Sequence, residues 1–220
     1  MKPEIQITAD GSPTLFVPEM DEHYHSVNGA GSESRHVFIN AGFLELAKEK
    51  ETGNRINILE LGFGTGLNAM LTALEAETCG LKVNYSGLEK FPLPEEIYSK
   101  LDFGAENRSL FLKLHRAEWE KPVKISENFV LNKVCCDFND FRFPEKYDLV
   151  YYDAFAPDKQ PEVWQQTLFD AIFKSMNRGG ILTTYCAKGA VRRGFVQAGF
   201  AVERIPGPAG KREMLRCRVQ

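Results

Sequence analysis

The sequence predicts a single α/β domain built on a mainly parallel sheet. Short apolar runs rich in β-branched and aromatic residues alternate with segments of helical periodicity, the pattern of repeated β-α-β units. A glycine-rich turn joins the first of these runs to a helix, and a Pro/Gly turn near the carboxyl end joins two further extended segments. With 220 residues, 43% of them hydrophobic and 26% charged, the chain has the composition of an ordinary globular domain.

Five apolar runs are predicted to form the parallel strands, and they are residues 56–61, 83–88, 130–136, 147–152 and 181–186. Connecting helices are expected at residues 67–78, 107–118, 164–176 and 187–198. The last extended segments, 200–205 and 213–219, flank a Pro/Gly turn and should pair as an antiparallel hairpin. The hairpin brings the expected sheet to seven strands.

The first 34 residues differ from the rest of the chain. Asp10-Gly11-Ser12-Pro13 is typical of a turn, and the segment from Tyr24 to Gly31 is polar and broken by glycines. We expect a short N-terminal arm, residues 1–34, that packs on a single domain formed by residues 35–220. The first helix of that domain should run from about Arg35 to Lys50, with Ser34 as its N-cap.

Composition excludes several classes of protein. No stretch of about 18 uncharged apolar residues is present, and the N-terminus lacks the apolar core of a secretory signal. We therefore expect a cytoplasmic protein that does not enter a membrane. The five cysteines are an odd number without a C-x-x-C pair, which fits neither a disulfide framework nor a zinc ribbon. No metal site is expected.

The carboxyl end is basic although the whole chain carries a net charge of −3. From Lys188 onward there are eight basic and two acidic residues, a local charge of +6. The basic ones are Lys188, Arg192, Arg193, Arg204, Lys211, Arg212, Arg216 and Arg218. This asymmetry indicates a polyanion that approaches one side of the protein. A solvated basic face without a partner is the alternative.

The most informative motif is the glycine-rich turn between Ile58 and Asn68, whose sequence is ILELGFGTGLN. Glycines let the backbone approach a ligand where a side chain would collide. The G-x-G-x-G spacing, with Glu60 two residues before Gly62, is the pattern of class I S-adenosylmethionine methyltransferases. Dinucleotide enzymes normally have G-x-G-x-x-G instead. A glycine turn with a purely structural role is the alternative.

Two further acids support a nucleoside site. Glu89 ends the second strand, where a carboxylate can accept hydrogen bonds from both ribose hydroxyls, and Asp137 follows the third strand, within reach of an adenine amino group. Ligands of open α/β sheets bind outside the carboxyl ends of the strands, so these acids should lie on one rim. Singly, each acid is more often a surface charge at a strand end, and it is their alignment on one rim that favours a site.

The fourth strand ends at Asp153, which is followed by Phe155 and, after a short loop, Trp164. A methyl transfer to nitrogen needs close, in-line placement of the amine. An alkylamine with a pKa near 10 must also lose a proton, at a cost of about 4 kcal/mol at neutral pH, and a nearby carboxylate can receive it. We predict that Asp153 orients and deprotonates an amine, with Phe155 and Trp164 as walls of the acceptor pocket. The alternative is a capping Asp153 beside core aromatics.

Taken together, these segments resemble the methyltransferase half of the MnmC family of tRNA wobble-uridine modifiers, including its free-standing form, MnmD. The resemblance covers nearly the whole chain and rests on residues 60–68, 89–93, 153–157, 191–194, 198–200 and 210–214 and on the arm. It implies a Rossmann-like class I methyltransferase sheet with a reversed final hairpin. It also implies N-methylation of 5-aminomethyl-2-thiouridine in tRNA to 5-methylaminomethyl-2-thiouridine, with S-adenosyl-L-methionine as cofactor. The implied cofactor-binding residues are Tyr24, Glu60, Gly62, Phe63, Gly64, Thr65, Gly66, Asn68, Glu89, Lys90, Asp137 and Asp153.

The resemblance and the basic end of the chain agree on the partner. Phosphate contacts by Lys188, Arg192, Arg193, Lys211 and Arg212 are expected to hold a tRNA anticodon stem-loop. We expect no flavin oxidase domain in this chain, and hence no oxidase activity. The main rival is a methyltransferase or aminopropyltransferase that acts on a small-molecule amine, since spermidine synthase-like enzymes share this sheet. A non-catalytic nucleotide-binding or RNA-binding module is the other alternative.

Overall fold

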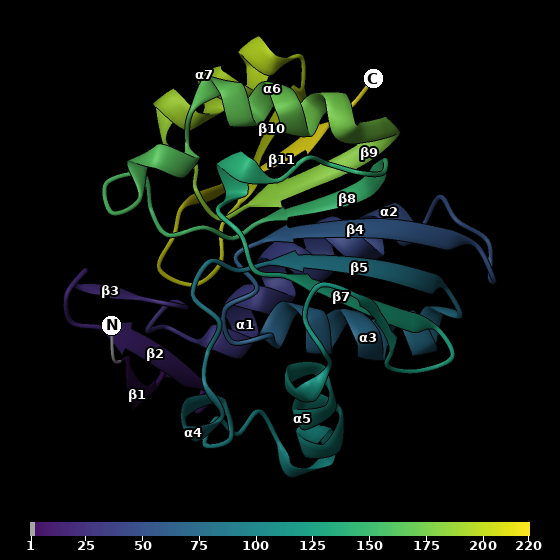
Figure 1. The fold of residues 1–220 in the computed structure, drawn as a ribbon. Coiled ribbons are helices and arrows are strands. Elements are labelled where there is room, and N and C mark those ends of the chain that lie inside the picture. The colour runs from purple at the N-terminus through teal and green to yellow at the C-terminus, as the bar shows by residue number, and fades with distance from the viewer. Residues whose placement is uncertain (1–2) are drawn as a thin grey trace.

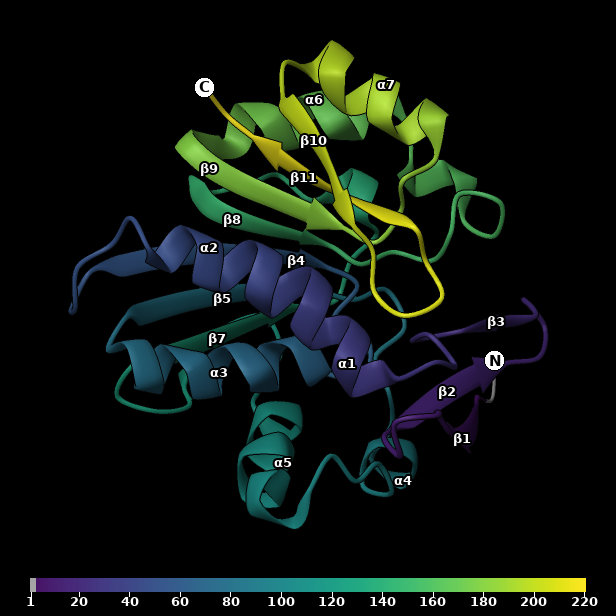
Figure 2. The same cartoon turned by 180° about the vertical axis from the view of Figure 1, so that it is seen from behind.

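The computed structural model describes residues 3–220 as a central eight-stranded sheet and a separate three-stranded sheet (Figures 1 and 2). The strands are β1 (Glu4–Ile7), β2 (Pro13–Val17), β3 (Glu22–His23), β4 (Arg55–Leu61), β5 (Lys82–Leu88), β6 (Pro122–Lys124), β7 (Phe129–Val134), β8 (Tyr147–Tyr152), β9 (Met176–Thr184), β10 (Ala201–Pro206) and β11 (Glu213–Arg218). The α-helices are α1 (Ala30–Ser34), α2 (Leu44–Ala47), α3 (Leu67–Cys79), α4 (Glu95–Tyr98), α5 (Arg108–Arg116), α6 (Gln166–Ser175) and α7 (Gly189–Ala198). A π-helix, η1 (Arg35–Phe43), joins α1 to α2, and single 3₁₀ turns are η2 (Ala105–Asn107), η3 (Phe138–Asp140) and η4 (Pro161–Val163).

The central sheet has the strand order β10-β11-β9-β8-β4-β5-β7-β6. Its inner strands β7, β5, β4, β8 and β9 pair in parallel, whereas β10 and β11 form an antiparallel hairpin that pairs with β9 through β11. The predicted α/β class and the reversed terminal hairpin are therefore confirmed. The sheet has eight strands rather than seven because the three-residue strand β6 pairs antiparallel with β7. A strand this short is too small to show a period of two.

Most predicted elements lie within two residues of the observed ones, with β9 as the main exception. β9 begins at Met176 rather than at residue 181. Its pairing with β8 shifts register between Tyr147, which pairs with Met176, and Leu149, which pairs with Ile181. The residues between these two pairs, including Gly179 and Gly180, bulge out of the ladder. The prediction placed this glycine-containing segment between elements.

The first helix also begins earlier than predicted, at Ala30, and Ser34 lies inside it without acting as a cap. The arm provides the caps instead, because the Ala30 N–H donates to Thr8 Oγ1 (3.2 Å) and the Ser32 N–H to Asp10 Oδ2 (2.9 Å). These side chains satisfy backbone donors that the first turn of a helix leaves unpaired. Each capping residue is 22 positions away in sequence from the helix residue that it caps. No local sequence motif could therefore predict these caps. The division into an arm, residues 1–34, and a domain, residues 35–220, stays a prediction.

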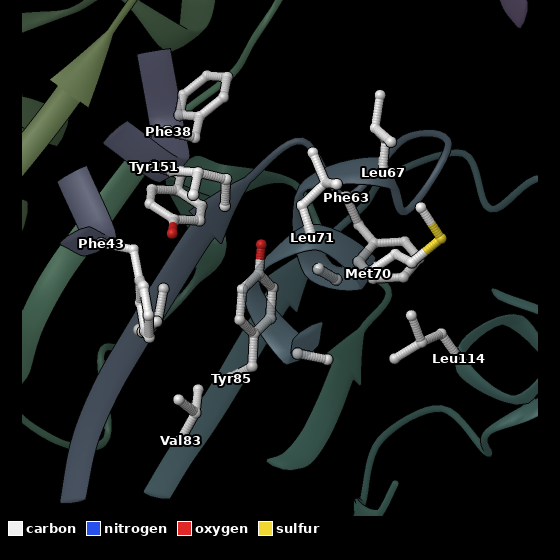
Figure 3. Packing of buried hydrophobic residues seen from close by; sticks show 14 of the residues in the cluster. Phe38, Phe43, Phe63, Leu67, Met70, Leu71, Val83, Tyr85, Leu114 and Tyr151 are labelled. Atoms are coloured by element: carbon white, nitrogen blue, oxygen red, sulfur yellow. The ribbon is translucent and has the colours of Figure 1, made fainter. Parts of the chain in front are cut away.

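The helices cover both faces of the central sheet. Helices α1, η1, α2 and α3 lie on one face, and α6 and α7 lie on the other, as the two opposite views show (Figures 1 and 2). Side chains of β4 alternate accordingly: Ile58 belongs to the core under η1 and α3, whereas Leu59 and Leu61 belong to the core under α6 and α7. In the first core, Phe38 of η1 packs against the ring of Tyr151 (Figure 3).

The close approach of η1 to the sheet depends on a glycine. A β-carbon at Gly42 would lie 3.3 Å from side-chain atoms of Leu149, Tyr151 and Thr183. The helix backbone therefore rests almost directly on β8 and β9. The N-terminal end of α1 therefore lies at the edge of the sheet where the parallel strands end. The arm, which precedes α1, lies at the same edge (Figure 2).

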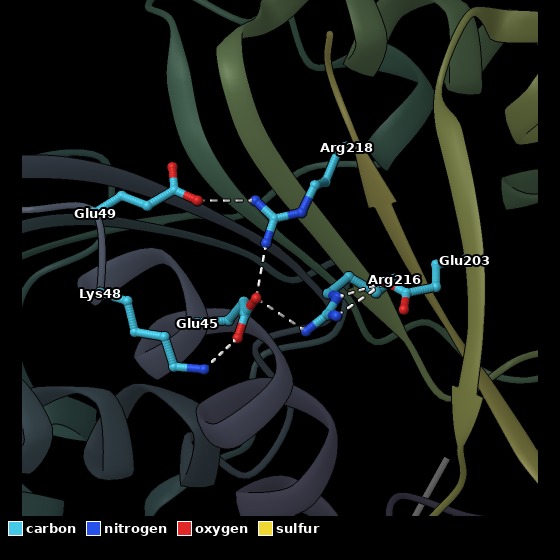
Figure 4. Close-up of polar contacts among 6 residues, drawn as sticks. All are labelled: Glu45, Lys48, Glu49, Glu203, Arg216 and Arg218. Atoms are coloured by element: carbon cyan, nitrogen blue, oxygen red, sulfur yellow. Dashed lines mark hydrogen bonds and ion pairs between the residues drawn. The ribbon is translucent and has the colours of Figure 1, made fainter.

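Arginines of β11 form ion pairs that connect this strand to its neighbours (Figure 4). Arg218 Nη2 lies 2.8 Å from Glu45 Oε1 on α2, and Arg216 Nη2 lies 2.9 Å from Glu203 Oε2 on β10. Glu49 also accepts from Arg218, at 3.3 Å. These arginines belong to the basic end of the chain, and their charges are compensated within the fold.

Within residues 3–220, no helix combines the length and the apolar character needed to cross a bilayer.

The turn after β4 is held against the end of β8. The Asp153 N–H donates to Leu61 O (3.0 Å), and the Phe63 N–H donates to Leu88 O at the end of β5 (2.9 Å). Gly62 has a φ of 97°, and a β-carbon there would lie 2.4 Å from Asp153 O. The strands β4 and β8 can end side by side only if this position has no side chain.

Replacing Gly62 with Ala should therefore destabilise the fold more than a positive φ alone explains. Gly179→Ala is the matched control, because Gly179 has a φ of 78° but nothing lies within 4 Å of the place that a β-carbon would take there. We expect Gly179→Ala to lower the free energy of unfolding by about 1 kcal/mol and Gly62→Ala by at least about twice that. Chemical denaturation measures both values. Equal losses would show that the close approach to Asp153 is not a constraint.

Candidate active site

A cavity of about 850 Å³ lies between the arm and the carboxyl ends of the parallel strands. Strand ends β4, β5 and β8 contribute the glycine turn, Glu89 and Asp153, and the arm contributes the segment around Tyr24. Of the predicted site residues, the structure brings together in its lining Tyr24, Gly62, Phe63, Gly64, Thr65, Asn68, Glu89, Lys90, Asp153, Phe155 and Lys211. Glu60, Gly66, Asp137, Trp164, Lys188, Arg192, Arg193 and Arg212 do not line it.

Glu89 lies beneath the glycine turn, where its carboxylate accepts two backbone hydrogen bonds. Gly64 N–H donates to Oε2 (3.0 Å) and Phe91 N–H donates to Oε1 (2.8 Å). Burial raises the pKa of Glu89, and these backbone donors oppose the rise. Each carboxylate oxygen keeps a second lone pair toward the cavity, so Glu89 can accept hydrogen bonds from a diol such as a ribose.

Glu60 and Asp153 are joined through one amide. Asn68 Nδ2 donates to Glu60 Oε1 (2.8 Å) and to Asp153 Oδ2 (2.9 Å). Burial raises the pKa of Glu60 well above its ordinary value, and the neighbouring Asp153 carboxyl raises it further. Burial, followed by the charge of Glu33, raises the pKa of Asp153 to about 8. In the ligand-free protein Asp153 therefore retains its proton near neutral pH, and a cation in the cavity would favour its ionised form.

The glycine turn is held by two histidines that are not among the predicted site residues. His25 Nε2 of the arm lies 2.7 Å from Thr65 Oγ1, and His115 Nε2 of α5 donates to Thr65 O (2.9 Å). Burial lowers the pKa of both histidines to about 4, so both are neutral at physiological pH. They bind the same residue of the turn from opposite segments of the chain. His115 lies on an amphipathic helix, and no spacing signal distinguishes it from a core histidine.

Trp164 and Asp137 occupy different places from those expected. Trp164 lies in the core under α6 and α7, where its ring packs on Tyr152 and its Nε1–H donates to Phe155 O (2.8 Å). It is therefore a positioning residue for Phe155 rather than a wall of the cavity. Asp137 pairs with Lys90 (2.8 Å) and caps η3, outside the cavity lining. Packing on Tyr152 holds Trp164 in the core, and the ion pair with Lys90 and the cap of η3 hold Asp137 outside the lining.

The predicted tRNA-binding residues fall into two groups. Lys188 pairs with Asp158, and Lys211 lines the cavity and lies 2.6 Å from Glu33 Oε1. Arg192, Arg193 and Arg212 form no ion pair with any residue in 3–220, and Arg193 and Arg212 are exposed. No cluster of three or more His, Cys, Asp or Glu side chains suited to a metal ion occurs in that same range.

A mainly parallel sheet with a reversed final hairpin, a G-x-G-x-G turn after its first parallel strand and a carboxylate at the end of the next define a class I methyltransferase fold. The chain belongs to the S-adenosyl-L-methionine-dependent methyltransferase family, whose sequence model matches residues 105–220.

Similar proteins agree with this assignment. The chain is 32% identical to the tRNA 5-methylaminomethyl-2-thiouridine biosynthesis bifunctional protein MnmC of Idiomarina loihiensis, over 96% of this chain and 37% of that protein. It is 29% identical to the protein of the same name from Cupriavidus necator, over 94% of this chain and 33% of that protein. The chain thus spans about a third of the length of these relatives, and its resemblance to their methyltransferase part is confirmed.

Solved structures show the same fold. The crystal structure of MNMC2 from Aquifex aeolicus superposes with a TM-score of 0.85 at 28% identity, over 100% of this chain and 71% of that one. Spermidine synthase from Thermotoga maritima superposes with a TM-score of 0.60 at 10% identity, over 99% of this chain and 72% of that one. The second likeness shows the fold alone.

The residues of the cavity fit S-adenosyl-L-methionine. Gly62 and Gly64 have φ values of 97° and 50°, and a β-carbon at Gly64 would lie 3.1 Å from the Tyr24 ring, so the turn leaves room for a ligand only as glycine. Asn68 Oδ1, on a residue that lines the cavity, is buried without a hydrogen-bond partner among the described residues, which leaves an acceptor beside the turn. Glu89 would hold the ribose, and Tyr24 and Phe63 would contact the nucleoside. When bound, the cofactor supplies an electrophilic methyl group on a positively charged sulfur.

The raised pKa of Asp153 makes cofactor affinity depend on pH. The sulfonium charge should favour the ionised carboxylate and so lower the pKa of Asp153 from about 8, with release of a proton on binding. The affinity for S-adenosylmethionine should therefore rise from pH 6 to about pH 8 and then level off. Calorimetry in buffers of different ionisation enthalpy measures both the affinity and the released proton.

S-adenosylhomocysteine is the matched control, because it lacks the methyl group and the positive charge on sulfur and keeps the rest of the molecule. Its affinity should change little over the same range, since Glu60, Glu89, Glu33 and Lys211 act on both ligands alike. Identical pH profiles for the two ligands would show that Asp153 does not face the sulfonium.

Proposed function

We propose that this chain N-methylates the aminomethyl group of 5-aminomethyl-2-thiouridine at the tRNA wobble position, giving 5-methylaminomethyl-2-thiouridine. The observation that carries the proposal is Asp153, a carboxyl at the end of β8 that lines the cavity beside the cofactor turn and has a pKa of about 8. The names of the MnmC relatives support this substrate. The proposal covers the methyl-transfer step alone, and a cytoplasmic location follows from a tRNA substrate.

The carboxylate of Asp153 has two tasks in this reaction. An alkylammonium is not nucleophilic, so Asp153, ionised once the sulfonium is bound, must first accept one of its protons. It then holds the amine by a remaining N–H, which directs the nitrogen lone pair toward the methyl group. The nitrogen–carbon bond forms as the carbon–sulfur bond breaks, and that electron pair stays on sulfur. The base takes up one proton for each methyl group transferred.

Neighbouring groups fix this geometry. Asn68 Nδ2 binds one oxygen of Asp153 and leaves the other for the amine. The rings of Tyr24 and Phe155 meet edge to face with centroids 5.2 Å apart, which closes the cavity between the arm and β8. Trp164 supports the Phe155 backbone from below. Held in this way, the amine has little freedom to leave the line of attack.

Substitution of Asp153 by Asn should lower kcat by about 10²- to 10⁴-fold, because the amide cannot accept the proton, while cofactor affinity at pH 6 changes little. Transfer of a tritiated methyl group to tRNA that carries the aminomethyl intermediate measures the loss. Asp140→Asn, at an exposed carboxylate outside the cavity, is the control and should retain activity.

Undiminished turnover by Asp153→Asn would refute its role as base. The same assay with putrescine or spermidine as acceptor separates tRNA modification from the rival function on a small-molecule amine. Transfer to a polyamine but not to tRNA would replace the proposed substrate.

We propose that Arg192, Arg193 and Arg212 contact tRNA phosphates. Arg192 and Arg193 lie on α7, and Arg212 lies in the turn between β10 and β11, close to the carboxyl edge of the sheet. Lys188 and Lys211 contribute less than the sequence indicated, because each has an internal acidic partner. Arginines without such a partner are available for phosphate oxygens.

The double substitution Arg192→Glu with Arg193→Glu should raise the KM for tRNA about tenfold or more, and should flatten the dependence of KM on salt, since two phosphate contacts are lost. Arg178→Glu is the matched control, because Arg178 is exposed at the opposite, amino-terminal end of β9. An unchanged KM in the double variant, or an equal rise in the control, would argue against this surface.

A further inference from the structure

An internal ammonium group already occupies part of the cavity. Lys211, in the turn between β10 and β11, places Nζ 2.6 Å from Glu33 Oε1 and 3.9 Å from the centroid of the Tyr185 ring. The other oxygen of Glu33 accepts a hydrogen bond from Ser26 N–H (2.7 Å). A buried carboxylate beside an aromatic face is the arrangement by which proteins recognise alkylammonium groups.

This ammonium site adjoins the reaction carboxyl. Glu33, Lys211, Tyr185 and Asp153 all line the same cavity. The Tyr185 hydroxyl donates to Ala154 O (2.8 Å), so its ring lies next to the backbone that carries Asp153. Burial is the main cause of the raised pKa of Asp153, the charge of Glu33 raises it further, and the charge of Lys211 lowers it.

We infer that Glu33 and the Tyr185 ring form the docking subsite for the ammonium group of the acceptor, and that the Lys211 side chain fills this subsite in the free protein. The inference rests on the proposed function, because it requires an acceptor with a primary amine. The incoming ammonium replaces that of Lys211, so Glu33 is never left as a buried charge without a partner. The acceptor then presents its amine to Asp153, which removes the proton.

The fold permits Lys211 to leave. Its side chain is 34% exposed, whereas that of Glu33 is 8% exposed, so the lysine lies at the mouth of the subsite and the carboxylate lies inside. The turn that carries Lys211 contains Gly207 and Gly210, and Gly210 has a φ of 84°. Withdrawal toward solvent moves the Lys211 ammonium to the same side as Arg212, where a tRNA phosphate can compensate it.

Two substitutions in one ion pair test the inference, because they should act in opposite directions. The probe is 5-aminomethyluridine, and 5-hydroxymethyluridine is the uncharged control ligand, each titrated into protein saturated with S-adenosylhomocysteine. Lys211→Met empties the subsite and should increase the affinity for the aminomethyl probe about tenfold. Glu33→Gln removes the carboxylate and should decrease it by a similar factor. Neither should change binding of the hydroxymethyl control.

An ion pair that only fastens the hairpin to α1 would behave differently. Both substitutions break the same contact, so affinity for the aminomethyl probe would then change in the same direction or not at all, and that result would overturn the inference. Thermal unfolding identifies a variant that has lost its fold. In that event Lys211→Gln, which keeps a hydrogen-bond donor toward Glu33, replaces Lys211→Met and carries the same expectation.

The readout separates this inference from the proposed function. Opposite shifts in affinity, together with methyl transfer to tRNA, support both. Methyl transfer with shifts in the same direction leaves the proposed function intact and refutes the subsite. Opposite shifts without transfer to tRNA support the ammonium subsite and refute the proposed acceptor.

Discussion

The site depends on one shared hydrogen-bond donor, the side-chain amide of Asn68. Its Nδ2 donates hydrogen bonds to both Glu60 and Asp153. Asn68 therefore links the carboxyl at the end of β4 to the carboxyl that follows β8. Two buried carboxyls this close cannot both ionise without a nearby positive charge. The ligand-free site therefore holds protons that a cation can displace. That property suits a reaction in which both the methyl donor and the protonated acceptor carry positive charge.

The arm is part of this site. His25 binds Thr65 in the glycine turn, Tyr24 packs on Phe155, and Asp10 caps the helix that carries Glu33. These contacts make the geometry of the turn depend on residues before the first strand of the central sheet.

Local patterns predicted the fold well because strands, helices and glycine turns are encoded in neighbouring residues. Glu89 and Asp153 were predicted for the same reason, since a strand end is visible in the sequence. His115 and Glu33 could not be predicted, because each lies on a helix whose sequence has no motif for a site. Tyr185 directly follows β9 but resembles an ordinary core aromatic, so its strand-end position alone did not single it out. Trp164 was misplaced because an aromatic residue after a strand can face either the cavity or the core, and only packing on Tyr152 decides between them.

Charge along the sequence was a poor guide to charge in space. The basic end of the chain suggested one continuous phosphate-binding surface, yet Arg216 and Arg218 pair with acids of α2 and β10, and Lys211 turns into the cavity. The carboxylates of Glu33, Glu89 and Asp153 line the cavity. Outside it lie Arg192, Arg193 and Arg212, which have no ion-pair partner among residues 3–220. A nucleoside that carries an ammonium group at its tip and phosphates along its backbone has the complementary arrangement of charges. Placing the cationic end of such an acceptor at Asp153 therefore brings its anionic backbone toward α7, and the reverse orientation would set like charges against each other at both ends.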